Sequence, residues 1–122
     1  MAHIMILDDV KDFTDMLTLI LERAGHTVSA FNDEDQSLAF AQTHHPDAAI
    51  LDIKLKRLSG VKMLEELKKR LPELKVMMLT GYPTLESAKN ALNLGAAAYC
   101  VKPFDRAELV EKVREMLSSP AS

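Results

Sequence analysis

Polar side chains follow four short apolar runs in this 122-residue chain, and their types suit phosphoryl transfer. The acidic pair Asp8 and Asp9 follows one run, Asp52 follows another, and Thr80 and Lys102 follow two later ones. If each run is a strand of one parallel sheet, these side chains meet at its carboxyl edge, where such sheets bind ligands. We therefore expect the site to converge on Asp52.

The chemistry of this set can be argued from its groups. Three carboxylates at one edge repel each other and favour a hard cation, and Mg²⁺ suits them because it takes a few carboxylates and keeps several waters. If Asp52 attacks a phosphorus atom, an aspartyl phosphate results. The metal and Lys102 would neutralise the phosphoryl oxygens in the transition state, and the Thr80 hydroxyl could bond to the product.

Composition and motifs exclude several other classes of protein. Neither a Cys/His spacing typical of zinc sites nor a GxxxxGK[ST] nucleotide loop is present. The net charge of -3 argues against a nucleic-acid-binding surface, and no run reaches the ~20 apolar residues that span a bilayer. The single cysteine, Cys100, excludes an internal disulfide and predicts a cytoplasmic location.

Strand-like and helix-like segments alternate along the chain, which predicts a parallel α/β sheet with helices on both faces. We expect strands at 3–7, 26–31, 47–51, 75–79 and 97–101. We expect helices at 11–24, 33–44, 60–70, 84–94 and 105–117. Candidate helix caps are Asp9, Asn32 or Asp33, Ser59 and Asp105. The length suits one domain, 1–117, followed by a polar tail or linker stub, 118–122.

With these residues in place, the chain resembles the receiver domains of two-component response regulators over residues 3–117. The resemblance rests on Asp8-Asp9, Asp52, Gly60, Thr80-Gly81, Tyr99 and Lys102-Pro103-Phe104. It implies a flavodoxin-like (βα)5 sandwich whose five parallel strands have the order 2-1-3-4-5. That order comes from the family and not from the spacing of the residues.

The resemblance also implies a role for each site residue. Asp52 is the expected phosphoacceptor. Asp9, Asp52 and the backbone carbonyl of Lys54 are expected Mg²⁺ ligands, and Asp8 is expected to bind the ion directly or through a water. Lys102 would contact the phosphoryl group, aimed by a cis peptide bond to the proline that follows it.

The family's function implies a switch with protein partners. A histidine kinase or a phosphotransfer protein would donate the phosphoryl group. Thr80 and Tyr99 would respond, and the face formed by residues 84–94, 97–101 and 105–117 would change its affinity for an effector domain or for a second copy of the chain. Direct contact with nucleic acid or membrane is not expected. Receivers also catalyse their own phosphorylation and dephosphorylation.

The chain departs from the commonest family pattern near the site. Lys56 stands where many receivers have proline, and Val10 stands where many have glutamate. Lys54 and Tyr82 lie two residues beyond Asp52 and Thr80. The resemblance implies that these two positions flank the path of the attacking water. We hypothesise that these two long side chains slow hydrolysis of the aspartyl phosphate.

Three other functions compete with the phosphorylated switch. A receiver-like module could bind proteins independently of phosphorylation, but the intact set of reactive residues argues against this. A phosphatase with an aspartyl intermediate usually needs a second acid and a substrate cap, and no insertion here is long enough. A flavodoxin would bind a flavin phosphate, which the acidic pair Asp8-Asp9 would repel.

Overall fold

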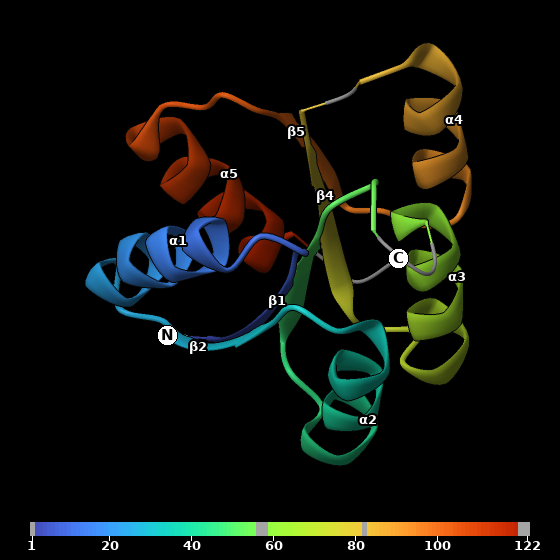
Figure 1. Cartoon of the computed structure of the whole chain (residues 1–122), viewed down its shortest axis with the longest axis horizontal. Coiled ribbons are helices and arrows are strands. Elements are labelled where there is room, and N and C mark those ends of the chain that lie inside the picture. Colours follow the sequence, from blue (N-terminus) through green and yellow to red (C-terminus); the bar gives the residue numbers. More distant parts are fainter. Residues whose placement is uncertain (1, 56–58, 82, 120–122) are drawn as a thin grey trace.

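The computed structural model describes residues 2–55, 59–81 and 83–119, in which five strands alternate with five helices (Figure 1). The strands are β1 (His3–Leu7), β2 (Thr27–Phe31), β3 (Ala48–Leu51), β4 (Lys75–Thr80) and β5 (Ala98–Val101). The helices are α1 (Lys11–Arg23), α2 (Glu34–His44), α3 (Gly60–Arg70), α4 (Leu85–Asn93) and α5 (Arg106–Ser118). Every element lies within one residue of its predicted bounds.

The strands form one parallel sheet in the order β2-β1-β3-β4-β5, which confirms the fold expected from the family resemblance. The register pairs Leu7 of β1 with Leu51 of β3, and Leu51 with Met78 of β4. Asp8 and Asp52 therefore follow directly on two paired residues of neighbouring strands. This register is what places the two aspartates side by side at the carboxyl edge.

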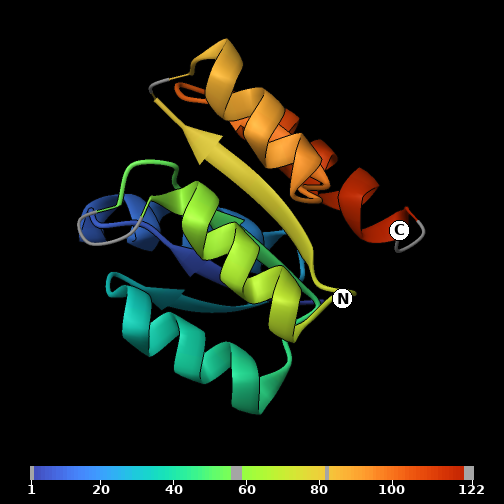
Figure 2. The same cartoon turned by 90° about the vertical axis from the view of Figure 1, so that its right-hand side faces the viewer.

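Helices cover both faces of the sheet (Figures 1 and 2). Ile4 and Ile6 of β1 point into a core formed with α1 and α5. Met5 and Leu7 point into the opposite core, which is formed with α2, α3 and α4. Because successive residues of a strand face opposite sides, an uninterrupted apolar run such as this one fits a strand buried on both faces.

The helix caps agree with the sequence at two of the four predicted starts. Asp33 accepts a hydrogen bond from the Gln36 amide at 3.0 Å, and Ser59 caps α3 in the same way. The predicted cap at Asp9 is wrong, because the residue before α1 is Val10, which makes no side-chain cap. Asp105 precedes α5 but makes no side-chain cap bond there.

Candidate functional site

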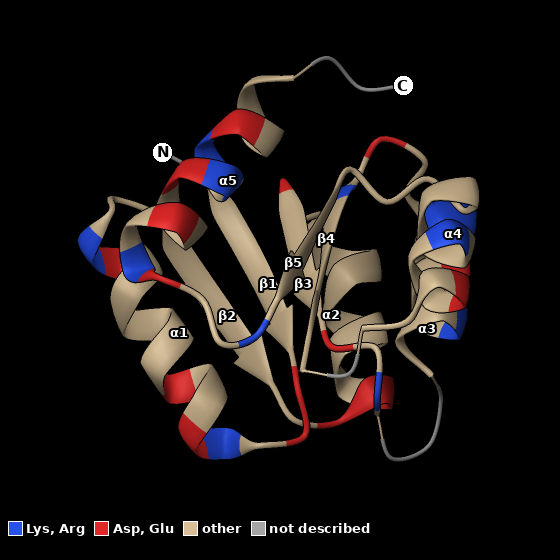
Figure 3. Ribbon diagram, turned by 90° about the horizontal axis from the view of Figure 1, so that it is seen from above, with Lys and Arg blue, Asp and Glu red and all other residues tan. Residues whose placement is uncertain are grey.

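Three charged side chains meet where β1, β3 and β5 end. In the ribbon view of Figure 3, acidic and basic segments of the chain lie near the ends of the strands. The Lys102 Nζ atom lies 2.9 Å from Asp8 Oδ2 and 3.5 Å from Asp52 Oδ2. The Asp8 side chain is 4% exposed, that of Asp52 is 13% exposed and that of Lys102 is 21% exposed. Asp52 is thus the more accessible of the two carboxylates, and a single ammonium group bridges the pair.

The backbone around Asp52 fixes the direction of its side chain. The Asp52 amide donates to the Leu7 carbonyl at 3.1 Å, and the Lys54 amide donates to Asp52 Oδ1 at 3.2 Å. The Gly60 amide donates to the Ile53 carbonyl at 2.6 Å, which brings the start of α3 against the chain that follows β3. A Cβ atom at position 60 would collide with the Asp52 carbonyl oxygen, so this close approach requires glycine.

Lys102 reaches the carboxylates from the far side of the site. Its amide donates to the Thr80 carbonyl at 2.7 Å, and the Lys102–Pro103 peptide is cis, as the family resemblance implied. The Nζ atom also lies 4.0 Å from the centroid of the Phe13 ring, which packs edge-on against Phe104. A cation over an aromatic face is attracted to it, so Phe13 helps to hold the ammonium group over the aspartates.

Burial raises the pKa of the Asp52 carboxyl above its ordinary value. The Lys102 ammonium opposes this shift in the pKa, and the neighbouring Asp8 carboxylate adds to it. The ionised form of Asp52 is therefore destabilised relative to the protonated form, and a bound cation or the loss of one carboxylate charge would stabilise the site.

Replacing Asp52 by asparagine should consequently stabilise the metal-free protein at neutral pH. The pKa of Asp52 is raised in the folded protein from its ordinary value of about 3.8. Between these two pKa values, the folded wild type holds a proton on Asp52 that the unfolded chain has lost. Wild-type stability therefore falls as pH rises through the window from that ordinary value to the raised one. Urea unfolding in EDTA at several pH values should give an advantage for Asp52→Asn that is smallest in acid and grows across this window. An advantage that is independent of pH would contradict the electrostatic cause.

The predicted metal ligands are brought together only in part. The described residues contain no group of three or more His, Cys, Asp and Glu side chains arranged to hold a metal ion. Asp8 and Asp52 both contact the Lys102 ammonium group. Asp9 is the next residue after Asp8, and its Oδ1 atom is buried. Carboxylate oxygens of this kind fit Mg²⁺, which needs few protein ligands and keeps several waters. In this structure the Lys102 ammonium supplies the positive charge between Asp8 and Asp52.

The two residues expected to respond to phosphorylation lie on the neighbouring strands. Thr80 is fully buried and ends β4, next to the strand that leads into Asp52. Tyr99 of β5 is half-buried against the core under α3 and α4, and its hydroxyl lies 3.3 Å from Ser87 Oγ on α4. The structure thus connects Tyr99 to α4 through a side-chain contact that the sequence did not predict.

Several predicted features stay untested. Lys56 and Tyr82 lie outside the described residues, so the hypothesis of slowed hydrolysis stays a prediction. Lys54 is exposed, and its amide donates to Asp52 Oδ1. The expected contact between its backbone carbonyl and a metal ion stays a prediction. Val10 is 57% exposed at the rim of the site.

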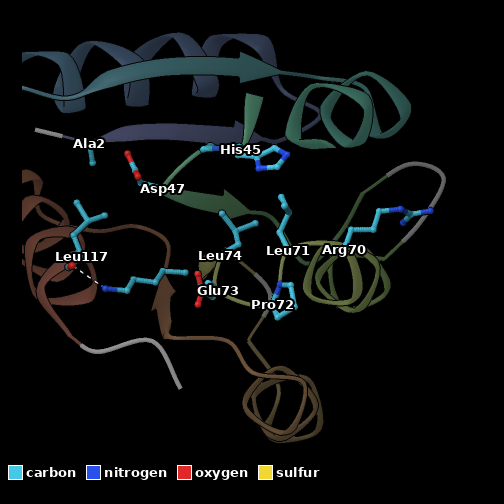
Figure 4. A pocket seen from close by; sticks show the side chains of 11 residues that line it. Ala2, His45, Asp47, Arg70, Leu71, Pro72, Glu73, Leu74 and Leu117 are labelled. Carbon is cyan, nitrogen blue, oxygen red and sulfur yellow. Dashed lines mark hydrogen bonds between the residues drawn. The ribbon is translucent and has the colours of Figure 1, made fainter. Parts of the chain in front are cut away.

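One large surface cleft in the described part of the chain lies away from this site. A cleft of about 890 Å³ lies at the opposite edge of the sheet, where Ala2 precedes β1, Asp47 precedes β3 and Leu74 precedes β4 (Figure 4). A smaller, mainly apolar cleft of about 610 Å³ adjoins Lys102 and is lined by Phe13 and Phe104. We assign the chemistry to the carboxyl edge because Asp8, Asp52 and Lys102 meet there, away from the cleft of about 890 Å³.

The match to known proteins decides the family. The model of the response regulator receiver domain matches residues 4–114. The chain belongs to this family. A CheY-like receiver domain protein of Methanospirillum hungatei has a TM-score of 0.91 and 36% identity, with 94% of this chain and 92% of that chain covered. Magnesium binding and phosphorylation are general features of receiver domains.

Curated relatives of the receiver domain are longer proteins. The nitrogen assimilation regulator NtrX of Azorhizobium caulinodans is 36% identical over 113 residues, which cover 90% of this chain and 25% of NtrX. The regulator PhoP of Bacillus subtilis is 31% identical over 93% of this chain and 48% of PhoP. The chain therefore spans a quarter to about half the length of these two relatives. No helix in the described part of the chain is long and apolar enough to cross a membrane.

Proposed function

We propose that this receiver domain is a switch that accepts a phosphoryl group on Asp52 from a phosphohistidine of a histidine kinase or phosphotransfer protein. The observation that carries the proposal is the Asp52 carboxylate, which is still 13% exposed and lies 3.5 Å from the Lys102 ammonium. An accessible oxygen nucleophile beside a fixed cation is the arrangement that phosphoryl transfer needs.

In the transfer step, an Asp52 oxygen attacks phosphorus and forms the acyl phosphate bond. The bond between phosphorus and the donor's histidine nitrogen breaks, and its electron pair returns to the imidazole ring, which then takes up a proton. Lys102 neutralises charge on the phosphoryl oxygens, while the Lys54 amide at 3.2 Å holds the attacking carboxylate in position. The protein thereby catalyses its own phosphorylation. Dephosphorylation would be a separate step, in which water attacks the phosphorus atom, the bond between phosphorus and the Asp52 oxygen breaks, and inorganic phosphate leaves as the Asp52 carboxylate is restored.

A magnesium ion would complete the charge balance. Asp8, Asp9, Asp52 and the backbone carbonyl of Lys54 would hold Mg²⁺, which when bound supplies positive charge for the phosphoryl oxygens. The buried Asp8 carboxylate, whose Oδ1 atom accepts from the Val10 amide at 3.0 Å, is oriented for this role before any ligand arrives.

The output would arise at the α4–β5–α5 face. The new charge at Asp52 draws Thr80 toward the phosphoryl group, and Tyr99 leaves its place beside Ser87. Helix α4, every residue of which is described, buries only Ala91, and it exposes Leu85 and Leu92. A helix with so few buried contacts costs little to move.

The contact between Ser87 and Tyr99 should favour the resting form. Replacing Ser87 by alanine is expected to tighten the binding of beryllofluoride, which mimics the phosphoryl group, by about three- to fivefold, the worth of one ordinary hydrogen bond. Titration followed by ¹⁹F NMR in the presence of Mg²⁺ would measure this affinity.

Because Ser87 also completes the helix cap with Thr84, a double-mutant cycle is needed to isolate the contact. In a Tyr99→Phe background, Ser87→Ala should change the affinity for beryllofluoride no further. An equal effect of Ser87→Ala in both backgrounds would assign it to the cap and contradict the contact.

The partners of the switch follow from its place in a regulator. We propose a cytoplasmic domain whose face at α4, β5 and α5 binds an effector domain or, once phosphorylated, a second copy of the chain. The net charge of -3 disfavours direct contact with nucleic acid, so any effect on DNA would pass through another domain or protein.

The proposal is tested by intact mass after incubation with acetyl phosphate, with and without Mg²⁺. We expect a single phosphoryl adduct on the wild type that needs Mg²⁺, is lost in Asp52→Asn and is retained in Asp12→Asn, a matched exposed control on α1. A wild type that gains no adduct and binds no beryllofluoride would instead favour a module that acts without phosphorylation.

A further inference from the structure

We propose that Asn32 is a positioning residue for the acidic turn, in that its side-chain amide holds the backbone that aims Asp8 and Asp9 at the magnesium ion. This inference rests on the proposed function. It assigns a role to a residue that the sequence offered only as one of two alternative helix caps.

The end of β2 holds the acidic turn from two directions. The Asp8 amide donates to the Phe31 carbonyl at 3.2 Å, and the Asp8 carbonyl accepts from Asn32 Nδ2 at 2.7 Å. The same Nδ2 atom lies 3.2 Å from Thr14 Oγ1 on α1. Asn32 thus links the peptide between Asp8 and Asp9 to both β2 and α1.

The orientation of the Asn32 amide follows from its two partners. The Asp8 carbonyl can only accept a hydrogen bond. The Thr14 hydroxyl donates its proton to the Lys11 carbonyl at 2.9 Å, so its oxygen is left to accept. Both partners therefore need a donor, and the NH₂ group of Asn32 is the end of the amide that must face them.

The peptide that Asn32 holds joins two predicted metal ligands. Rotation of this peptide would turn the Asp8 carbonyl and the Asp9 amide together and would move both carboxylates relative to Asp52. Asn32 is not engaged in capping α2, because Asp33 makes that bond, and its side chain is exposed and adds little to the core. The contact with the acidic turn is what its amide contributes.

The experiment measures Mg²⁺ affinity directly by titrating ¹⁵N-labelled protein with MgCl₂ and following the amide shifts of the acidic turn. We expect Asn32→Ala to weaken Mg²⁺ binding about fivefold, the factor that one ordinary hydrogen bond is worth. The rate of adduct formation from acetyl phosphate at saturating Mg²⁺ should stay within about twofold of wild type, because Asn32 acts on metal affinity and not on the transfer step. Asn90→Ala, an exposed asparagine on α4, is the matched control and should leave Mg²⁺ affinity unchanged.

A second variant keeps the test decisive if the alanine protein does not fold. Asn32→Asp has the same shape but presents no donor to the Asp8 carbonyl. Its added negative charge would by attraction alone tighten Mg²⁺ binding, whereas loss of positioning weakens it. Weaker binding supports the inference, and binding equal to or tighter than that of the wild type overturns it. If the wild type binds no Mg²⁺ and forms no adduct, the proposed function fails. If the wild type does both and the two Asn32 variants bind Mg²⁺ as tightly as it does, only the role of Asn32 is wrongly assigned.

Discussion

Replacing Lys102 by methionine should slow phosphorylation of Asp52 about a hundredfold, the usual effect of removing one charge-stabilising group from a transition state. It should also lower the free energy of unfolding of the metal-free protein by about 2 kcal/mol. The ammonium lies 2.9 Å from Asp8 and 3.5 Å from Asp52, so its removal leaves two adjacent, largely buried carboxylates without their cation. The effect on stability should be smaller than for a fully buried pair, because Lys102 keeps some contact with water.

Both effects can be separated from a general loss of charge. Lys89→Met on the exposed surface of α4 removes the same charge and should change neither quantity. Adding Asp52→Asn to Lys102→Met removes one of the two repelling carboxylates and should restore most of the lost stability at neutral pH. Urea unfolding in EDTA measures stability, and the time course of the phosphoryl adduct measures the rate. If Lys102→Met unfolds like the wild type, the ammonium does not hold the carboxylates together.

Replacing Gly60 by alanine should be the most damaging single-atom change near the site. The added Cβ would collide with the Asp52 carbonyl oxygen and come within 2.6 Å of the Ile53 Cα, and backbone atoms cannot swing away as a flexible side chain can. We expect a loss of about 2 to 3 kcal/mol in the free energy of unfolding, as for other overpacked sites. The shift of α3 should also displace Asp52 and slow its phosphorylation by more than tenfold.

Gly81→Ala is the matched control for this prediction. A methyl group at Gly81 would meet the Lys102 side chain at 3.9 Å, which is an ordinary contact, so this variant should stay within about 1 kcal/mol of wild type. Urea unfolding and the adduct time course would be measured on both variants. Equal behaviour of the two alanine variants would show that the close approach at Gly60 does not constrain the site.

The fold could be predicted almost completely from the sequence because its signals are local. Apolar runs of four residues marked four of the five strands, the alternation of Val28 and Ala30 with polar residues indicated β2, and breaks such as Gly95 and Pro103 marked where elements end. The strand order could not be obtained from these signals, since pairing depends on contacts between distant segments. It came from the family resemblance, and the structure confirmed it.

The site could be predicted by residue type but not by contact. Position at the end of a strand was enough to select Asp8, Asp52 and Lys102, which do meet. That Phe13 lies beneath the Lys102 ammonium, or that Asn32 holds the Asp8 carbonyl, depends on how helices and loops pack in three dimensions. The wrong cap at Asp9 has a different, local cause.

At the turn after β1, contacts between residues close in sequence determine what Asp8 and Asp9 each do. The Asp8 side chain accepts from the Val10 amide, and Val10 precedes α1 without a side-chain cap. A carboxylate next to a helix start is typical of a cap, so the sequence alone could not assign these two acids to different tasks.

Asp52 itself is expected to carry the phosphoryl group. Borohydride reduces an aspartyl phosphate to homoserine, so peptide mapping after reduction identifies the modified residue. We expect homoserine at position 52 after treatment with acetyl phosphate and Mg²⁺, and none when either is left out. Homoserine at Asp8, Asp9 or any other aspartate, or an intact-mass adduct with no homoserine at position 52, would contradict the claim.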